Sequence, residues 1–326
     1  MSSHTVSIII PTYNEGQYLP ECLNSIFKLD YAKENIEIIV VDNGSTDRTR
    51  EIAISSGVKV LRDDSSNVSG LRNLGASHSE GDILAFVDAD CIVSKEWLKK
   101  ASRYFDDNDV AAWGGPPVPM QDAGWIAATW FALVEKTNQV EYVDWIGTVD
   151  LFVRGKQFLS IGGFNESLVS CEDVDLCYKL RKYGKIVSDS RIEVVHLREA
   201  STIKEFIKKE MWRGRSNWRG IRSHGLLLHE LPSLSIPLYF GFFLPTLLLG
   251  FLVSLNTTWL FSVVLFYLLP TLAVMFKLRR KKIRLVTLLR LLFLVQVYFF
   301  SRTVAVFKKD KKNTGSESAN PKQVQL

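Results

Sequence analysis

Cysteine is scarce in this chain, with four among 326 residues. Cys22, Cys91, Cys171 and Cys177 are scattered and form no closely spaced pairs, which argues against a disulfide framework and against a structural zinc site. We expect all four to be reduced, packed thiols of a cytosolic domain. Residues 1–11 lack a basic region followed by a long apolar core, so we expect a domain that starts directly with a strand, without a secretory signal.

Acidic residues are nearly absent from the last third of the chain. From position 233 to the end there are 13 Lys or Arg and 2 Asp or Glu, which leaves 27 basic and 33 acidic residues before it. The net charge of +5 therefore averages an acidic part and a basic part. Basic residues next to apolar segments are typical of contact with a membrane surface, so we predict a membrane partner and no nucleic acid.

Charged residues are also missing from two long apolar runs, 234–255 and 259–276. Each run is close to the length that crosses a bilayer, and Asn256 between them suits a turn. Two such runs in succession are rare in soluble domains. They predict a membrane hairpin rather than a buried helical bundle.

A third apolar segment, 285–307, contains Arg290 and Arg302 and lies between a basic cluster at 277–284 and a lysine-rich tail at 308–326. A third crossing would carry the tail lysines outside, against the positive-inside tendency. An interfacial helix would keep them in the cytoplasm and would lower the cost of the two arginines. We prefer the interfacial helix, and both arrangements stay open. Either one gives a multi-pass protein of the cell membrane with a cytoplasmic N-terminal domain and a disordered polar tail.

Short Val- and Ile-rich runs alternate with helix-length segments in the first 90 residues, which predicts a parallel sheet covered on both faces. The expected strands are 6–10, 36–41, 58–61 and 83–87, and the expected helices are 15–28, 47–55 and 69–79. Beyond them we expect a Gly-Gly-Pro-Pro loop at 113–119, an aromatic helix at 125–136, a strand at 149–153, a helix at 172–183 and a strand at 192–195. We predict a mixed α/β domain over 1–200, an interfacial segment at 201–232 and a membrane region at 233–307.

Four acidic clusters follow one another along the first 175 residues. They are Asn14-Glu15, Asp42 with Asp47, Asp88-Ala89-Asp90, and Glu172-Asp173. The first three directly follow expected strands. Because the carboxyl ends of parallel strands meet at one edge of a sheet, these side chains can hold a metal and a nucleotide there. The pattern predicts chemistry on a phosphate-bearing donor.

These clusters resemble the motifs of the family 2 glycosyltransferases, which are inverting enzymes with the GT-A fold. The resemblance is carried by Pro11–Glu15, Val40–Asp47, Asp88–Asp90 and Glu172-Asp173, and also by Arg72–Gly75 and Ile161–Glu166. It covers about two thirds of the chain, from Val6 to Arg215. It implies an α/β fold, a GT-A catalytic domain with a Rossmann-like mixed sheet, followed by an α-helical membrane-anchoring region.

The resemblance implies a metal site for Mg²⁺ or Mn²⁺. Asp90 would be the first ligand, and Asp88 would contact the ribose or the metal. His196, which ends an expected strand, would complete the metal site in related enzymes or would have a structural role here. A divalent cation held by carboxylates would neutralise the leaving diphosphate of a nucleotide sugar.

The resemblance also implies a donor pocket formed by Pro11, Thr12, Glu15, Asp42, Arg72 and Asp88. Asp42 would bind the base, or would cap the next helix, although Asp47 suits that capping turn better. Arg72 would donate hydrogen bonds to the base or diphosphate, or would form an ordinary salt bridge.

Inversion at an anomeric carbon requires one base to take the proton of the attacking hydroxyl. Asp173, with Glu172 beside it, is predicted to be that base at the start of a helix, where a carboxylate would also serve as a helix cap.

Residues 204–222 contain seven Lys or Arg together with Trp212 and Trp218, and we expect them to rest on lipid headgroups. Arg213 and Arg215 are candidate ligands of the donor diphosphate. They fall where processive synthases of the family carry Gln-x-x-Arg-Trp, and the absence of that motif argues against long-chain polymerisation. Asp150 is another departure, because many relatives have Asn there.

The sequence thus predicts a membrane-anchored hexosyltransferase that moves one sugar from a UDP- or GDP-sugar to a lipid-linked or polysaccharide acceptor. Trp125, Trp130 and Trp145 are expected to line the acceptor pocket or to belong to the core. A polyprenyl-phosphate sugar synthase and a non-catalytic nucleotide-binding membrane scaffold remain as alternatives. A nucleotidyltransferase is disfavoured because Pro11–Gly16 is not a Gly-rich phosphate loop.

Overall fold

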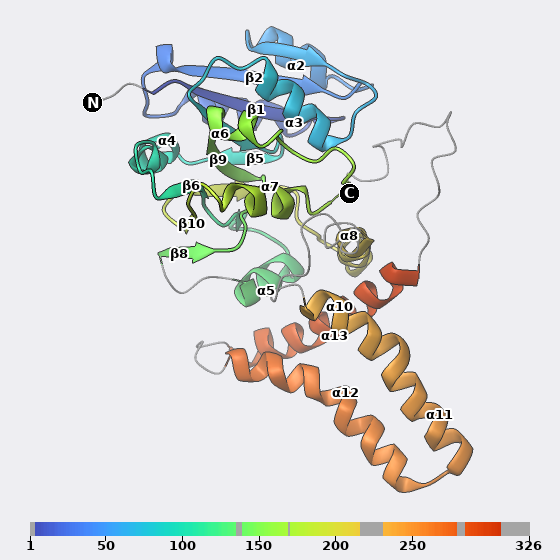
Figure 1. The fold of residues 1–326 in the computed structure, drawn as a ribbon. Helices are drawn as coiled ribbons and strands as arrows, with labels where there is room; N and C mark the ends of the chain where they lie inside the picture. Colours follow the sequence, from blue (N-terminus) through green and yellow to red (C-terminus); the bar gives the residue numbers. More distant parts are fainter. Residues whose placement is uncertain (1–3, 135–138, 169, 216–230, 279–283, 308–326) are drawn as a thin grey trace. The chain divides into compact units, whose positions relative to one another are not determined.

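The computed structural model describes residues 4–134, 139–168, 170–215, 231–278 and 284–307 (Figure 1). These residues form two compact units, one within 1–121 and 136–199, the other within 122–135 and 200–312. The tail at 308–326, residues 216–230 and most of the basic cluster at 277–284 lie outside the described residues. The predicted domain boundaries therefore stay a prediction, and each unit is described by itself.

The first unit contains a mixed eight-stranded sheet in the order β3-β2-β1-β4-β9-β6-β10-β8. Its strands are β1 (Val6–Thr12), β2 (Ile36–Asp42), β3 (Lys59–Arg62), β4 (Ile83–Val87), β6 (Val110–Gly114), β8 (Val140–Val143), β9 (Asp150–Arg154) and β10 (Lys185–Asp189). Strands β3, β2, β1 and β4 run parallel, whereas β9 runs antiparallel to both β4 and β6. A smaller sheet joins β5 (Cys91–Val93), β11 (Val194–His196) and β7 (Val118–Pro119).

Helices cover both faces of the large sheet, as the alternation of strands and helices predicts. They are α1 (Leu19–Phe27), α2 (Thr49–Ser55), α3 (Val68–Ser77), α4 (Trp97–Ala101), α6 (Gly155–Ser160) and α7 (Glu172–Leu180), with 3₁₀ turns at Lys33–Asn35 and Ser102–Tyr104. Ile8 of β1 packs in one core with residues of α1 and α4, and its neighbour Ile9 packs in the other core with residues of α3 and α7. This alternation is the two-residue period of a strand buried on both sides.

The expected loop at 113–119 is only partly a loop. Trp113 and Gly114 end strand β6, and Val118–Pro119 form β7, which pairs with β11. A Cβ added to Gly114 would stand 1.9 Å from the Asp150 carbonyl oxygen, and one added to Gly115 would stand 1.7 Å from that of Ile192. These glycines therefore permit close backbone packing instead of marking a turn, which explains the wrong prediction.

The second unit is helical. It comprises α5 (Trp125–Val134), α8 (Ile203–Arg215), α10 (Leu231–Leu238), a π-helical turn η4 (Tyr239–Phe243), α11 (Leu244–Ser254), α12 (Thr257–Leu278) and α13 (Leu285–Phe307). Three helical segments are long and apolar enough to cross a membrane: Ser235–Ser254, Thr257–Phe276 and Leu285–Ala305. The three predicted apolar helices are therefore present.

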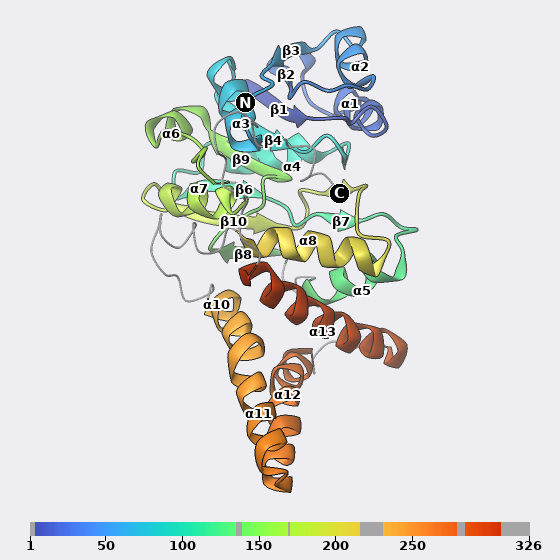
Figure 2. The ribbon, with the colours of Figure 1, turned by 90° about the vertical axis from the view of Figure 1, so that its right-hand side faces the viewer.

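The third of these helices differs from the other two in its packing. Within the unit, α13 lies alongside α8 and runs crosswise to the hairpin of α11 and α12 (Figure 2). The buried Glu210 carboxylate of α8 pairs with Arg302 of α13 at 3.3 Å, and a Cβ on Gly214 would stand 2.8 Å from Ala305 Cβ. One face of α13 is thus packed against protein, so this helix is less suited to a lipid environment on all sides.

Candidate active site

The acidic clusters meet at the carboxyl edge of the parallel strands of the first unit. Thr12 and Asp42 are partners in the register of β1 and β2. Asp88 and Asp90 directly follow β4, which pairs with β1 on its other side. Because these strands run parallel, their final residues lie at the same edge, where ligands bind in open α/β sheets.

Asp42 and Thr12 are buried at this edge, and their described partners are backbone groups. The Asp42 carboxylate accepts hydrogen bonds from the Ser45 N–H, and the Thr12 hydroxyl donates to the Val41 carbonyl at 3.3 Å. Pro11 is buried in β1 opposite Val41. Contact of these residues with a nucleotide stays a prediction.

Asp47 lies one residue before the N-cap of α2, Arg48, and contributes to the turn that begins this helix. Its carboxylate accepts from the N–H of Thr49, the first residue of α2, at 2.9 Å. It also accepts from the Gly16 N–H at 3.0 Å and so ties the turn after β1 to the start of α2.

Glu15 lies in a pair that the sequence did not reveal. Its side chain accepts from Arg198 Nη2 at 2.5 Å, and the Arg198 guanidinium lies over the Tyr18 ring at 4.8 Å. Burial raises the pKa of Glu15 to about 7, although the nearby Arg198 charge opposes this rise. Arg198 stands two residues after His196, and side chains two residues apart on an extended chain point to the same side. This spacing is the signal that could have identified Arg198 as a residue of the site.

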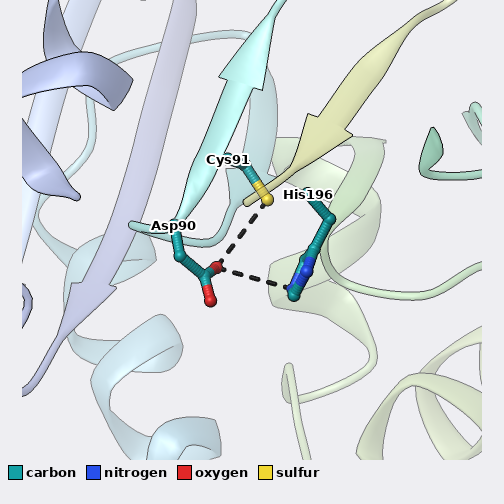
Figure 3. A group of neighbouring side chains, drawn as sticks. All are labelled: Asp90, Cys91 and His196. Atoms are coloured by element: carbon teal, nitrogen blue, oxygen red, sulfur yellow. Dashed lines mark hydrogen bonds and ion pairs between the residues drawn. The ribbon is translucent and has the colours of Figure 1, made fainter. Parts of the chain in front are cut away.

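Asp90, Cys91 and His196 form a compact group (Figure 3). His196 Nε2 lies 3.6 Å from Asp90 Oδ1, and the Cys91 sulfur lies 3.9 Å from the same oxygen. Cys91 and His196 are directly paired across β5 and β11. Burial raises the pKa of Asp90, and the adjacent Asp88 charge adds to this effect. Burial also raises the pKa of the Cys91 thiol well above its ordinary value.

Arg72 joins two of the predicted acidic clusters. Its side chain is buried and donates to Asp88 Oδ1 at 2.8 Å and to Glu172 Oε1 at 2.9 Å. The predicted salt bridge is therefore present, and it links the end of β4 to the start of α7. A buried guanidinium with two carboxylates fixes both of them in position.

Asp173 lies in the first turn of α7 next to Glu172, and its Oδ1 accepts from the Val174 N–H at 2.8 Å. Burial raises the pKa of Asp173 to about 7, and repulsion from Glu172 raises it further, against the attraction of Arg72. A carboxyl group whose pKa is near neutrality is suited to take up a proton at physiological pH.

The residues at this edge fit a divalent cation because carboxyl groups outnumber guanidinium groups. Two guanidinium groups, Arg72 and Arg198, stand against five carboxylates, Glu15, Asp88, Asp90, Glu172 and Asp173. The two basic neighbours of Asp90 are beyond hydrogen-bond distance, with His196 Nε2 at 3.6 Å and Arg198 Nε at 3.9 Å. A cation held by Asp90 and His196 would offset the excess of carboxyl groups and would give Asp90 a positively charged partner.

Arg213 and Arg215 belong to α8 of the second unit, so their proposed contact with a donor stays a prediction. Arg213 donates to Glu210 at 2.7 Å, while the side chain of Arg215 is outside the described part of the structure. Trp130 packs against Phe206 and Tyr298 and is therefore part of the core of its unit.

A mixed α/β sheet with acidic residues at its carboxyl edge is the arrangement expected of a GT-A glycosyltransferase, and the comparison with known proteins agrees. Residues 7–159 match the family described as Glycosyl transferase family 2. This match covers slightly less than half of the chain and agrees with the resemblance drawn from the motifs, and the mixed sheet agrees with the GT-A fold.

Three relatives illustrate the match. Glycosyltransferase AglE of Haloferax volcanii is 29% identical over 246 residues, which are 73% of this chain and 81% of AglE. The poly(ribitol-phosphate) beta-N-acetylglucosaminyltransferase TarS of Staphylococcus aureus is 37% identical over 108 residues, 31% of this chain and only 19% of TarS. The mannosyltransferase PcManGT of Pyrobaculum calidifontis, solved with GDP-Man and Mn²⁺, covers 92% of this chain and 86% of its own length, with a TM-score of 0.61 and 16% identity. That structural likeness shows the fold alone.

Proposed function

We propose that this protein is a membrane-anchored inverting glycosyltransferase that depends on a divalent cation. It would move one sugar from a nucleoside-diphosphate sugar to a lipid-linked or polysaccharide acceptor in cell-surface glycan or exopolysaccharide biosynthesis. The family 2 domain supports the reaction class, and the apolar helices of the second unit support an attachment to the membrane.

One observation carries the proposal: Arg72 connects the residues proposed to activate the donor with those proposed to deprotonate the acceptor. It holds Asp88, next to the cation ligand Asp90, and it also holds Glu172, next to the base Asp173. Donor activation and acceptor deprotonation must be positioned relative to each other, because transfer requires both at one anomeric carbon. A buried residue with a hydrogen bond to each side provides that positioning.

Asp90 and His196 would hold Mg²⁺ or Mn²⁺, which would neutralise the leaving diphosphate when bound. Asp173 would take the proton of the acceptor hydroxyl, and Arg72 would hold Glu172 in place beside it. Arg198, which lies between Glu15 and Asp90, would add a positive charge for the departing phosphates. Thr12, Glu15 and Asp42 would line the nucleotide pocket at the strand ends.

The membrane placement follows from charge and packing. We propose that α11 and α12 form a hairpin across the cell membrane, with the family 2 domain and the basic cluster at 277–284 on the cytoplasmic side. Helix α13 would lie in the interface, where Arg290 and Arg302 remain close to water. Its packing against α8 supports this arrangement over a third crossing.

The test is a donor screen with the purified full-length chain in detergent. PcManGT was solved with GDP-Man and a TarS fragment with UDP-GlcNAc, so GDP- and UDP-sugars are screened first, each with Mg²⁺ or Mn²⁺. The acceptors are a polyprenyl phosphate, a lipid-linked sugar and a soluble glycan, and products are detected by mass spectrometry. Transfer to the bare polyprenyl phosphate alone would favour the synthase alternative. No transfer from any donor, despite nucleotide binding, would favour the scaffold.

A further inference from the structure

We propose that Asp90, Cys91 and His196 form a tetrahedral site for Zn²⁺ or another thiophilic divalent cation. Occupation of this site would exclude the Mg²⁺ or Mn²⁺ of the transfer reaction and so inhibit the protein. The inhibition rests on the proposed function, whereas the zinc site rests only on the side chains shown in Figure 3.

The distances between the three ligand groups agree with a tetrahedral ion. Bond lengths of about 2.0 Å to oxygen and nitrogen and about 2.3 Å to sulfur give edges of about 3.3 Å between oxygen and nitrogen and about 3.5 Å between oxygen and sulfur. The Asp90 oxygen lies 3.6 Å from His196 Nε2 and 3.9 Å from the Cys91 sulfur. All three ligand atoms lie within 4.8 Å of one another, so small side-chain rotations suffice to complete the site.

The backbone holds two of these ligands in a fixed relation. Cys91 and His196 are opposite each other in the antiparallel pairing of β5 with β11, so their side chains leave the small sheet next to each other. Asp90 is the residue directly before Cys91, and its carbonyl oxygen accepts from the Leu197 N–H at 2.8 Å. The three ligands therefore come from two paired segments whose spacing is fixed by backbone hydrogen bonds.

The ligand types select the cation. A thiolate, an imidazole and a carboxylate match Zn²⁺, whereas Mg²⁺ and Mn²⁺ prefer oxygen ligands and higher coordination numbers. A hard cation would use Asp90 and leave Cys91 as a thiol. Zn²⁺ would bind the sulfur, and the thiol proton would be released to solvent. Three protein ligands would then leave one position, too few for a diphosphate that chelates the cation through two oxygens.

The closing experiment replaces zinc by Co²⁺, which reports its ligands by absorption. Full-length protein in detergent, without nucleotide, is titrated with Co²⁺. We expect intense visible bands of a tetrahedral ion and a near-ultraviolet sulfur-to-cobalt charge-transfer band, both removed by stoichiometric Zn²⁺. The Cys91→Ser variant should lose the charge-transfer band and bind Zn²⁺ at least about 100-fold more weakly, because loss of a residue that only hydrogen-bonds to a metal ligand already costs up to about 100-fold.

The control variants assign the sulfur. Cys177→Ser removes another buried thiol in the opposite core and should keep the band. A variant in which Cys22, Cys171 and Cys177 are all serine should also keep it, and this variant decides the matter if Cys91→Ser does not fold. Absence of the band in the parent protein, or equal zinc affinity in Cys91→Ser, would overturn the inference. A sulfur band in a protein that transfers no sugar would leave the zinc site standing and remove the proposed function.

Discussion

Glu172 and Asp173 are neighbours in the sequence, but their surroundings differ. Glu172 accepts from Arg72, whereas Asp173 accepts from a backbone N–H within its own turn. A carboxylate that accepts a hydrogen bond from a buried guanidinium is held in place by it and is less available to an acceptor hydroxyl. Asp173 therefore stays the predicted base, with Glu172 as the residue that shapes its surroundings.

Asp173→Asn should reduce sugar transfer by about 10²- to 10⁴-fold, the range typical for loss of a general base. Donor binding should change little, because the amide keeps the size of the side chain. The measurement compares product formation with the affinity for the donor by calorimetry. Glu172→Gln serves as the matched variant with the same change one position earlier. Full turnover by Asp173→Asn would refute the assignment of the base.

The pH dependence of transfer follows from the raised pKa of Asp173, about 7. The base must be deprotonated, so kcat/KM should rise about tenfold per pH unit below pH 7 and level off above it. The pH profile is measured with saturating Mn²⁺ and dilute acceptor. Glu15→Gln is the control, since the pKa of Glu15 is also raised to about 7. A profile whose midpoint disappears in Glu15→Gln would assign the ionisation to Glu15 instead.

At the scale of elements, the motifs at the ends of the first strands were predictable, because Val6–Ile10 and Ile83–Val87 each precede an acidic motif. The pairing of Arg198 with Glu15 was not predictable, since the two residues are 183 positions apart in the chain. The same holds for β7, because Val118–Pro119 becomes a strand only by pairing with β11. Local patterns identify elements that their own sequence favours, whereas long-range partners fix the rest.

Asp150 offers a prediction about β9 and the segments packed around it. Its buried carboxyl accepts from Trp97 Nε1 at 2.8 Å and from the Gly115 N–H at 2.7 Å, and burial raises its pKa to about 7. The folded state thus binds this proton more tightly than the unfolded chain. The protonated Asp150 carboxyl therefore adds up to about 4 kcal/mol to the free energy of unfolding. This contribution is complete below about pH 4 and is lost as the pH rises through 7.

Asp150→Asn should therefore make stability less dependent on pH. The amide has one oxygen, so one of the two donors loses its acceptor, and the variant should be less stable at pH 5 by about 1–3 kcal/mol. At pH 8 the deficit should shrink, because the parent then holds a buried charge. Thermal unfolding at both pH values measures the difference, with Trp97→Phe as the variant that removes one donor without removing the charge. An equal deficit at both pH values would contradict the raised pKa.

At the scale of the whole molecule, the number of membrane crossings can be tested by labelling. Asn256 lies between α11 and α12, and Ser316 lies in the basic tail. In intact cells, an impermeant maleimide should label Asn256→Cys. It should label Ser316→Cys only after permeabilisation, because an interfacial α13 keeps the tail in the cytoplasm. Labelling of both positions in intact cells would instead establish three crossings. The parent chain is the control for its four native thiols.

The excess of carboxylates at the sheet edge has a consequence for the folding equilibrium. Like charges held together in the folded domain are separated in the unfolded chain, so their repulsion lowers the free energy of unfolding. Any divalent cation that binds only the folded site shifts the equilibrium, by about 2.7 kcal/mol at 100 times its dissociation constant. The temperature at which heating unfolds the N-terminal α/β domain should therefore rise with Mn²⁺ and fall with a chelator. In Asp90→Asn this dependence on Mn²⁺ should be largely lost, so a domain that unfolds at the same temperature with and without Mn²⁺ would show that the site does not bind it.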